Sequence, residues 1–120
     1  GVFNKNINGI LKNHDNNSGS YVMEELKYKT NESIEFIKLD DINIESKVDF
    51  IKIDTEGSEL FVLEGAKNII DKNKPIIQVE TNMCSNKFFN YDKKEIFKFM
   101  FELGYKILDD DGNDPIFIHY

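Results

Sequence analysis

Acidic residues stand at the ends of two expected strands, where a parallel sheet presents its ligand-binding edge. Asp54 ends the apolar segment 48–54, and Glu80 ends the segment 76–80. Because ligands bind beyond the carboxyl ends of parallel strands, both carboxylates should reach one rim if the two strands are neighbours. Paired carboxylates can bind a cation, orient a hydroxyl or accept a proton. The alternative interpretation is that Asp54 and Glu80 only cap turns.

The loop that follows Asp54 carries further candidates. Glu56 and Gly57 lie between the first strand and the helix after it, so they should border the same rim. Gly57 is alternatively needed only for its backbone conformation. We expect Glu59 to be a first-turn helix residue, where a negative charge suits the helix dipole.

Other sources of chemistry are weak in this sequence. It contains no His-Glu-x-x-His or paired-cysteine metal signature, no glycine-rich dinucleotide loop and no P-loop, so we predict no dedicated metal site. The remaining chemically capable groups are expected to pack or to face solvent: His14, Cys84, His119, the phenylalanine-rich segment 96–103 and the acidic run 109–111.

A strand–helix–strand unit is expected to position the rim. Segment 48–54 is typical of a buried strand, and the apolar spacing that follows it predicts a helix closed by Pro75. Thr55 or Ser58 should cap this helix, and Gly65 with the following alanine should let it lie close to the sheet. Segment 76–80 is then the next strand, parallel to the first.

The flanking segments predict antiparallel structure and one more helix. Segments 7–11 and 21–23 suggest a hairpin, 33–39 a third strand, and 40–42 a turn or short helix. Towards the C-terminus, Asp92 and Glu95 form a capping box for a helix that ends at Gly104. Strands 105–108 and 115–120 should form a hairpin, with the last strand antiparallel to the rest.

Composition excludes several classes of partner. The chain has 120 residues, the size of a single domain, with 15 lysines, 22 acidic residues and a net charge of -7. This acidic balance argues against binding to nucleic acid or to anionic membranes. No apolar run is long enough to span a membrane. A single cysteine excludes an internal disulfide and suits a reducing compartment, so we expect a cytoplasmic protein.

Three adjoining motifs resemble one family. The segment VDFIKIDTEGSELFVLEGA, residues 48–66, resembles the signature of FkbM-type methyltransferases. Leu39-Asp40-Asp41-Ile42 is similar to the family's leucine–aspartate turn before that signature. Lys74-Pro75-Ile76-Ile77-Gln78-Val79-Glu80 is similar to its lysine–proline strand that ends in glutamate. The resemblance covers residues 34–82 well, and the order of elements through Tyr120 fits it.

The resemblance implies a Rossmann-like class I α/β fold that uses S-adenosylmethionine to methylate an oxygen of a sugar or natural product. It implies that segment 48–54 is the fourth strand, 58–73 the following helix and 76–80 the fifth strand. Asp54 then takes the acidic position beside methyl transfer, with Glu80 as a second catalytic acid. Asp54, Glu56 and Gly57 are the implied cofactor-binding residues, and the acceptor is a small molecule or glycan.

The departure from the family is at the N-terminal side. The family's first strands and its acidic–glycine–asparagine cofactor loop have no counterpart in this sequence. We therefore expect residues 1–120 to be one domain, the C-terminal portion of a methyltransferase domain, which binds cofactor weakly or not at all by itself. Two other interpretations remain. One is a non-enzymatic α/β module that forms a homodimer through an exposed sheet edge. The other is a metal-dependent phosphoryl hydrolase, disfavoured because Glu56 stands where a second aspartate is expected.

Overall fold

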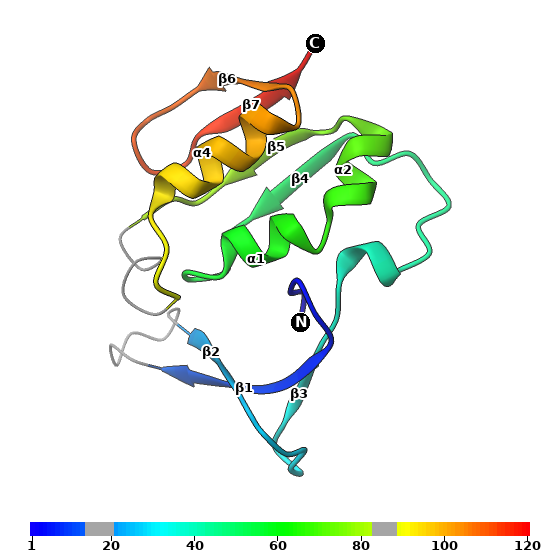
Figure 1. Ribbon diagram of the computed structural model, residues 1–120, viewed down its shortest axis with the longest axis vertical. Coiled ribbons are helices and arrows are strands. Elements are labelled where there is room, and N and C mark those ends of the chain that lie inside the picture. Colours follow the sequence, from blue (N-terminus) through cyan, green and yellow to red (C-terminus); the bar gives the residue numbers. More distant parts are fainter. Residues whose placement is uncertain (14–20, 83–88) are drawn as a thin grey trace.

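The computed structural model describes residues 1–13, 21–82 and 89–120, which form two sheets, the larger of which is covered by helices (Figure 1). His14 and Cys84 lie outside the described residues. The elements in chain order are β1 (Ile7–Asn13), β2 (Tyr21–Glu25), β3 (Ile34–Phe36), η1 (Leu39–Asp41), β4 (Phe50–Ile53), α1 (Glu59–Glu64), α2 (Lys67–Asn73), β5 (Ile76–Val79), α4 (Lys93–Glu102), β6 (Tyr105–Asp109) and β7 (Ile116–His119).

The larger sheet has the strand order β4-β5-β7-β6. Strands β4 and β5 pair in parallel, which confirms the predicted strand–helix–strand unit. Strand β7 inserts between β5 and β6 and runs antiparallel to both, which confirms the predicted C-terminal hairpin. The chain is therefore a mixed α/β fold in which one parallel pair meets an antiparallel hairpin.

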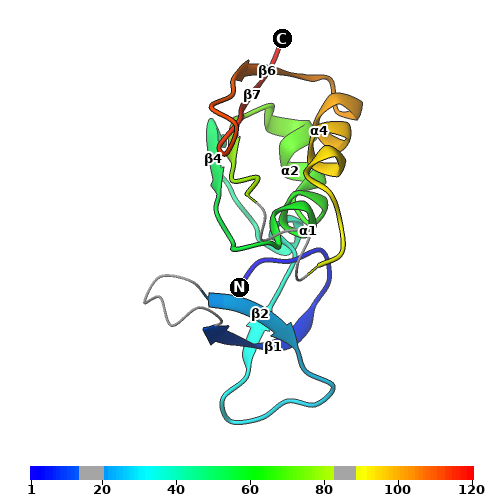
Figure 2. The ribbon, with the colours of Figure 1, turned by 90° about the vertical axis from the view of Figure 1, so that its left-hand side faces the viewer.

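Helices α1, α2 and α4 lie on the same side of this sheet (Figure 2). Their apolar faces and the facing side of the sheet enclose the main core, because alternate strand residues point to one face. The most fully buried side chains of that core are Leu63, Ile70, Ile77, Val79, Ile96, Met100 and Phe117.

The helix expected over 58–73 is broken into two. Helix α1 ends at Gly65, and Ala66 is the N-cap of α2. At Gly65 a Cβ atom would come within 2.0 Å of the carbonyl oxygen of Phe3, so the N-terminal segment approaches this position too closely for any side chain. Gly65 therefore lies against the backbone near Phe3 and not against the sheet, whereas Ala66 is fully buried in the main core that includes Ile77 and Val79.

The second helix is capped from a distant part of the chain. The carboxylate of Asp40, in η1, accepts hydrogen bonds from the backbone N–H groups of Asn68 and Ile69 at 2.9 Å each. These are orphan donors of the first turn of α2, which a side-chain oxygen stabilises. The Asp40 N–H in turn donates to the carbonyl of Gly65 at 2.9 Å. The leucine–aspartate turn is thus the cap that lets the chain start a new helix after the break.

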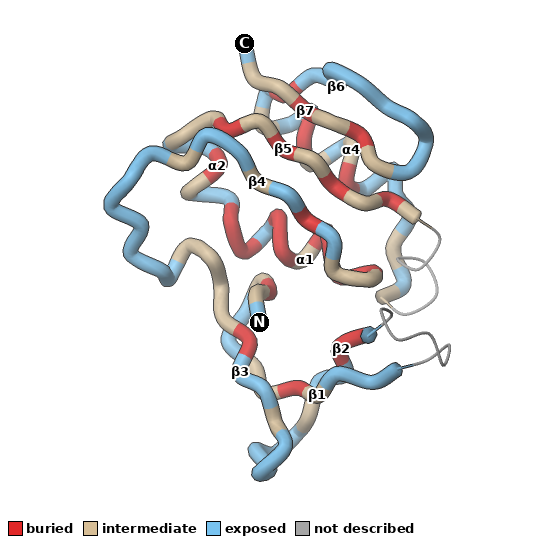
Figure 3. Tube along the Cα trace, turned by 180° about the vertical axis from the view of Figure 1, so that it is seen from behind, coloured by how far each residue is buried: buried red, intermediate tan, exposed pale blue. Residues whose placement is uncertain are grey.

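Strand β4 is one of the two edge strands of the larger sheet and is only partly buried (Figure 3). Phe50 remains 52% exposed, whereas Ile53 is 2% exposed. The prediction of a buried strand therefore holds for one face of β4 only, because the other face does not meet the helices.

The smaller sheet has the order β2-β1-β3 and is entirely antiparallel. The predicted hairpin of β1 and β2 is confirmed. The third strand is shorter than the predicted 33–39, since only Ile34–Phe36 pairs with β1. A second, smaller core beside this sheet is formed by Phe3, Met23 and Phe36.

Helix α4 follows the sequence signals at both ends. The Asp92 side chain accepts a hydrogen bond from Lys94 N–H at 2.8 Å, as an N-cap does. After the helix, Gly104 adopts φ +82°, which favours glycine. None of the helices among the described residues is long and apolar enough to span a membrane.

Candidate active site

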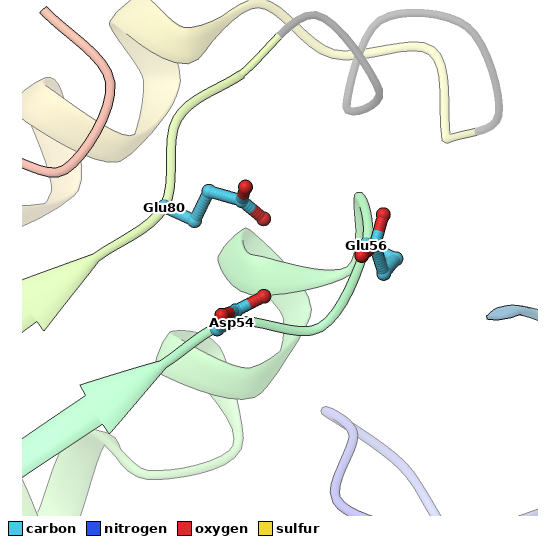
Figure 4. Close-up of side chains that lie close together, drawn as sticks. All are labelled: Asp54, Glu56 and Glu80. Carbon is cyan, nitrogen blue, oxygen red and sulfur yellow. The ribbon is translucent and has the colours of Figure 1, made fainter. Parts of the chain in front are cut away.

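The register of the parallel pair sets the position of the two rim carboxylates. Ile53 is paired with Val79, and the N–H of Glu80 donates to the carbonyl of Ile53 at 2.9 Å. Asp54 and Glu80 therefore leave neighbouring strands at the same level. Figure 4 shows both side chains extending into the same space, with Glu56 on the loop beyond β4. One oxygen from each of the three carboxyl groups lies within 4.8 Å of the others.

Glu80 is fixed by the segment that follows it. Both the N–H and the hydroxyl of Thr81 donate to the carbonyl of Asn113, at 2.6 and 3.0 Å, and Thr81 is 3% exposed. The Oε1 atom of Glu80 accepts from the side-chain amide of Asn82 at 2.6 Å. The loop between β6 and β7 thus holds the end of β5 in place at the rim.

Burial and the neighbouring carboxylate of Asp54 raise the pKa of Glu80 to about 7, with smaller contributions from Glu56 and Glu59. The Oε2 atom of Glu80 is buried, and no hydrogen-bond donor meets it among the described residues. Two carboxyl groups can hydrogen-bond only when one of them is protonated, so the pair is suited to hold one proton near neutral pH. Asp54 is also 3.5 Å from the ammonium group of Lys52, and its side chain is 47% exposed.

The raised pKa of Glu80 predicts that the stability of the fold depends on pH. The pKa of Glu80 is about 7 in the folded state, whereas its ordinary value, which applies to the unfolded chain, is 4.5. The folded state therefore binds the proton more tightly. Its stabilising effect is complete below 4.5 and is lost as pH rises through about 7. Because Glu80 is partly exposed, screening should leave a loss of about 1 kcal/mol in the free energy of unfolding. Urea unfolding across this range should show it, and Glu80→Gln should flatten the curve; an unchanged slope in the variant contradicts the assignment.

The loop after β4 is organised by Glu59 and not by the predicted caps. Ser58 occupies the N-cap of α1 without a side-chain cap hydrogen bond, and its hydroxyl donates to the carbonyl of Thr55 at 3.3 Å. The Oε1 atom of Glu59 accepts from the N–H groups of Thr55 and Gly57 at 2.9 and 3.0 Å. The prediction that the Thr55 or Ser58 side chain caps the helix was wrong, because the Ser58 hydroxyl bonds back to the loop and the Thr55 hydroxyl donates to Glu59.

A cavity of about 500 Å³ opens between this loop and the smaller sheet. Asp54, Thr55, Glu56 and Ser58 form its polar side. Its apolar side is formed by Val2, Leu11, Tyr21, Met23, Ile34 and Phe36. A ligand with a cationic or hydroxyl-bearing end and an apolar or ring-shaped body would match the two sides, since carboxylates attract such groups.

The structure brings Asp54, Glu56 and Glu80 together, as the sequence predicted for the rim. The three carboxylates could also hold a hard cation through oxygen atoms, although the sequence carries no metal signature. Gly57 is buried and has φ 108°, so its place in the loop follows from its backbone conformation. His119 packs its ring edge-on against Tyr105 at 5.3 Å, which confirms its expected packing role.

Two residues beside the site, Glu59 and Tyr91, have roles that were not predicted from the sequence. The hydroxyl of Tyr91 lies 3.2 Å from Oε2 of Glu59. A signal for Glu59 was present, because it falls on the same helical face as Leu63, Ala66 and Ile70, where a charged residue is unexpected. Tyr91 carried no comparable signal.

Comparison with known proteins places these features in a family context. Residues 4–107 match the family model described as methyltransferase FkbM domain. The crystal structure of methyltransferase FkbM from Methylobacillus flagellatus KT is similar over 100% of this chain, with a TM-score of 0.53 and 20% sequence identity. The chain spans 27% of the length of that protein, and at this identity the likeness shows the fold alone. A search of curated proteins gave no match.

Proposed function

The chain belongs to the FkbM methyltransferase family, and on that premise we propose that its carboxylate rim is the methyl-transfer site of an S-adenosylmethionine-dependent O-methyltransferase. In this proposal the larger sheet is the later part of a Rossmann-like class I domain, to which the chain contributes the C-terminal portion. The acceptor is a hydroxyl of a sugar or natural product, and the protein acts in the cytoplasm without nucleic acid.

The observation that carries the proposal is the pairing of Asp54 with Glu80 at the carboxyl ends of neighbouring parallel strands. S-adenosylmethionine would supply a methyl group carried on its sulfonium sulfur: the acceptor oxygen bonds to the methyl carbon as the carbon–sulfur bond breaks, and the neutral thioether leaves. The hydroxyl proton must leave at the same time, and a carboxylate within hydrogen-bond reach can take it. The rim offers two such groups, and its negative charge would attract the positively charged sulfonium of the cofactor.

The three carboxylates have different roles in this scheme. Asp54, which is half-exposed, orients the acceptor hydroxyl and accepts its proton. Glu80, with a pKa of about 7, assists by sharing a proton with Asp54. Glu56 faces the cofactor together with Asp54, because both line the 500 Å³ cavity, and Gly57 supports cofactor binding through the conformation of their loop. Correct orientation of the reacting atoms supplies the rest of the rate enhancement.

A second candidate is favoured by the outer strand. Strand β4 has no neighbour on its outer side among the described strands, and Phe50 on it is 52% exposed. Unpaired edges of this kind associate readily. The chain would then be a non-enzymatic module that forms a homodimer through β4.

Calorimetric titration of the chain with S-adenosylmethionine and with its demethylated product separates the two candidates. We expect weak but saturable binding of both by a monomer. Absence of binding, together with a dimer in analytical sedimentation, contradicts the proposal and supports the module. Metal-dependent release of phosphate from a generic ester would instead support a hydrolase.

A further inference from the structure

A buried carboxyl group lies directly beneath the loop of the candidate active site. Glu59 is 1% exposed, although it is the first residue of α1. Burial of a carboxyl group is costly unless hydrogen bonds replace the lost water, so its partners indicate what it stabilises. Those partners belong to the loop that bears Asp54 and Glu56.

The Oε1 atom of Glu59 accepts three hydrogen bonds from this loop. It accepts from Thr55 N–H at 2.9 Å, from the Thr55 hydroxyl at 3.2 Å and from Gly57 N–H at 3.0 Å. The residue between these two amides, Glu56, has φ 53°, a left-handed conformation that non-glycine residues rarely adopt. Such a conformation persists only where its surroundings enforce it. The two amide hydrogen bonds on either side of Glu56 supply that enforcement.

The other oxygen of Glu59 is held from a separate element. The Tyr91 hydroxyl donates to Oε2 of Glu59 at 3.2 Å and accepts from the N–H of Leu60 at 3.4 Å. The Tyr91 ring also packs edge-on against Phe61 at 5.8 Å. Tyr91 precedes α4, so it ties the chain after β5 to the start of α1. The carboxyl group is thereby fixed at both oxygens.

We propose that Glu59, held by Tyr91, is the positioning residue of the methyl-transfer site: it fixes the loop 54–57 so that the Asp54 and Glu56 carboxylates face the Glu80 carboxylate. That this site transfers methyl groups rests on the proposed function, whereas the positioning of the loop rests on the contacts above. Glu59 itself is not among the residues that line the cavity, whereas Thr55 and Ser58 are.

Tyr91→Phe tests the network with the loss of one oxygen atom and keeps the ring contact with Phe61. Amide hydrogen exchange, followed by NMR in the folded chain, should speed up at Thr55 and Gly57 by roughly tenfold, the effect of losing a hydrogen bond to a carboxylate. Exchange at Ile77 and Val79 in β5 should stay unchanged. Tyr28→Phe, at a tyrosine that is 81% exposed, is the matched control and should change none of these rates. Unaltered exchange at Thr55 and Gly57 in Tyr91→Phe overturns the proposal.

Variants of Glu59 add a rescue test. Glu59→Gln keeps an acceptor oxygen for the two loop amides but loses the charge, so exchange there should lie between wild type and Glu59→Ala. Glu102→Gln, an exposed position in α4, is the control. Equal exchange rates in Glu59→Gln and wild type would show that the acceptor oxygen of residue 59, and not its charge, positions the loop. Equal rates in wild type, Glu59→Gln and Glu59→Ala would overturn the proposal. Should Glu59→Ala fail to fold, the Tyr91→Phe and Glu59→Gln results decide.

Titration with S-adenosylmethionine separates this proposal from the proposed function. Wild type that binds, with Tyr91→Phe binding roughly threefold to tenfold more weakly per folded molecule, supports both. Equal affinity in the two proteins shows that the network does not position the site and overturns the inference. No binding by wild type contradicts the proposed function, and the exchange rates at Thr55 and Gly57 then decide by themselves whether Glu59 positions the loop.

Discussion

Replacement of Asp54 by asparagine is expected to lower methyl transfer by about 10² or more, because a positioned carboxylate that takes the acceptor proton contributes at least this factor. Asparagine fills nearly the same volume but cannot accept that proton. The rate is best measured as transfer of labelled methyl in a complete family member whose acceptor is in hand, at the position that matches Asp54. Unchanged turnover there would rule out Asp54 as the base.

The same substitution has a second effect that needs no acceptor. The Asp54 carboxylate is, after burial, the largest cause that raises the pKa of Glu80 to about 7. In Asp54→Asn we therefore expect the pKa of Glu80 to fall towards its ordinary value, measured by carboxyl carbon NMR across a pH titration. Asp49→Asn, just before β4 and paired with Lys47 at 2.8 Å, removes a charge outside the rim and should leave this pKa unchanged. An unshifted titration in Asp54→Asn would show that the two carboxyl groups do not interact.

Substitution of Gly65 by alanine should strongly destabilise the fold. The backbone at Gly65 has φ -76° and ψ -5°, which alanine adopts without strain, so the effect is steric. The new Cβ would lie 2.0 Å from the carbonyl oxygen of Phe3 and 2.9 Å from its carbonyl carbon. These are backbone atoms of a segment that also pairs with Ile37, so they can move only if the smaller sheet moves. Forced overpacking of this kind costs about 2–3 kcal/mol.

Thermal unfolding measures this cost. A loss of that size should lower Tm by roughly 10 °C in a domain of this length. Lys67→Ala, at an exposed position of α2, is the control for a change in the same region and should leave Tm nearly unaltered. An unaltered Tm in Gly65→Ala would mean that the N-terminal segment does not rest on this glycine. If the smaller sheet moved away from the cavity in Gly65→Ala without a fall in Tm, its contacts with the larger sheet would contribute little to stability.

Much of the larger sheet could be predicted from local patterns. Short apolar segments, the helical spacing after Asp54, Pro75 and Gly104 each restrict the backbone within a few residues, so the strand and helix order follows from the sequence. The wrong predictions fall where residues remote in sequence meet. The break at Gly65 depends on Phe3, and the new start at α2 depends on Asp40. No pattern within residues 58–73 contains that information.

Local sequence patterns are enough to identify the carboxylates that form the rim, because the carboxyl ends of adjacent parallel strands meet at one edge whatever the surrounding packing. The behaviour of those carboxylates depends instead on contacts between distant parts of the chain. The raised pKa of Glu80 comes from burial beside Asp54, and the cavity wall comes from the smaller sheet. The loop conformation depends on Glu59, which Tyr91 reaches from 32 residues away. Electrostatics and close packing depend on distances between remote residues, and periodicity along the chain does not encode those distances.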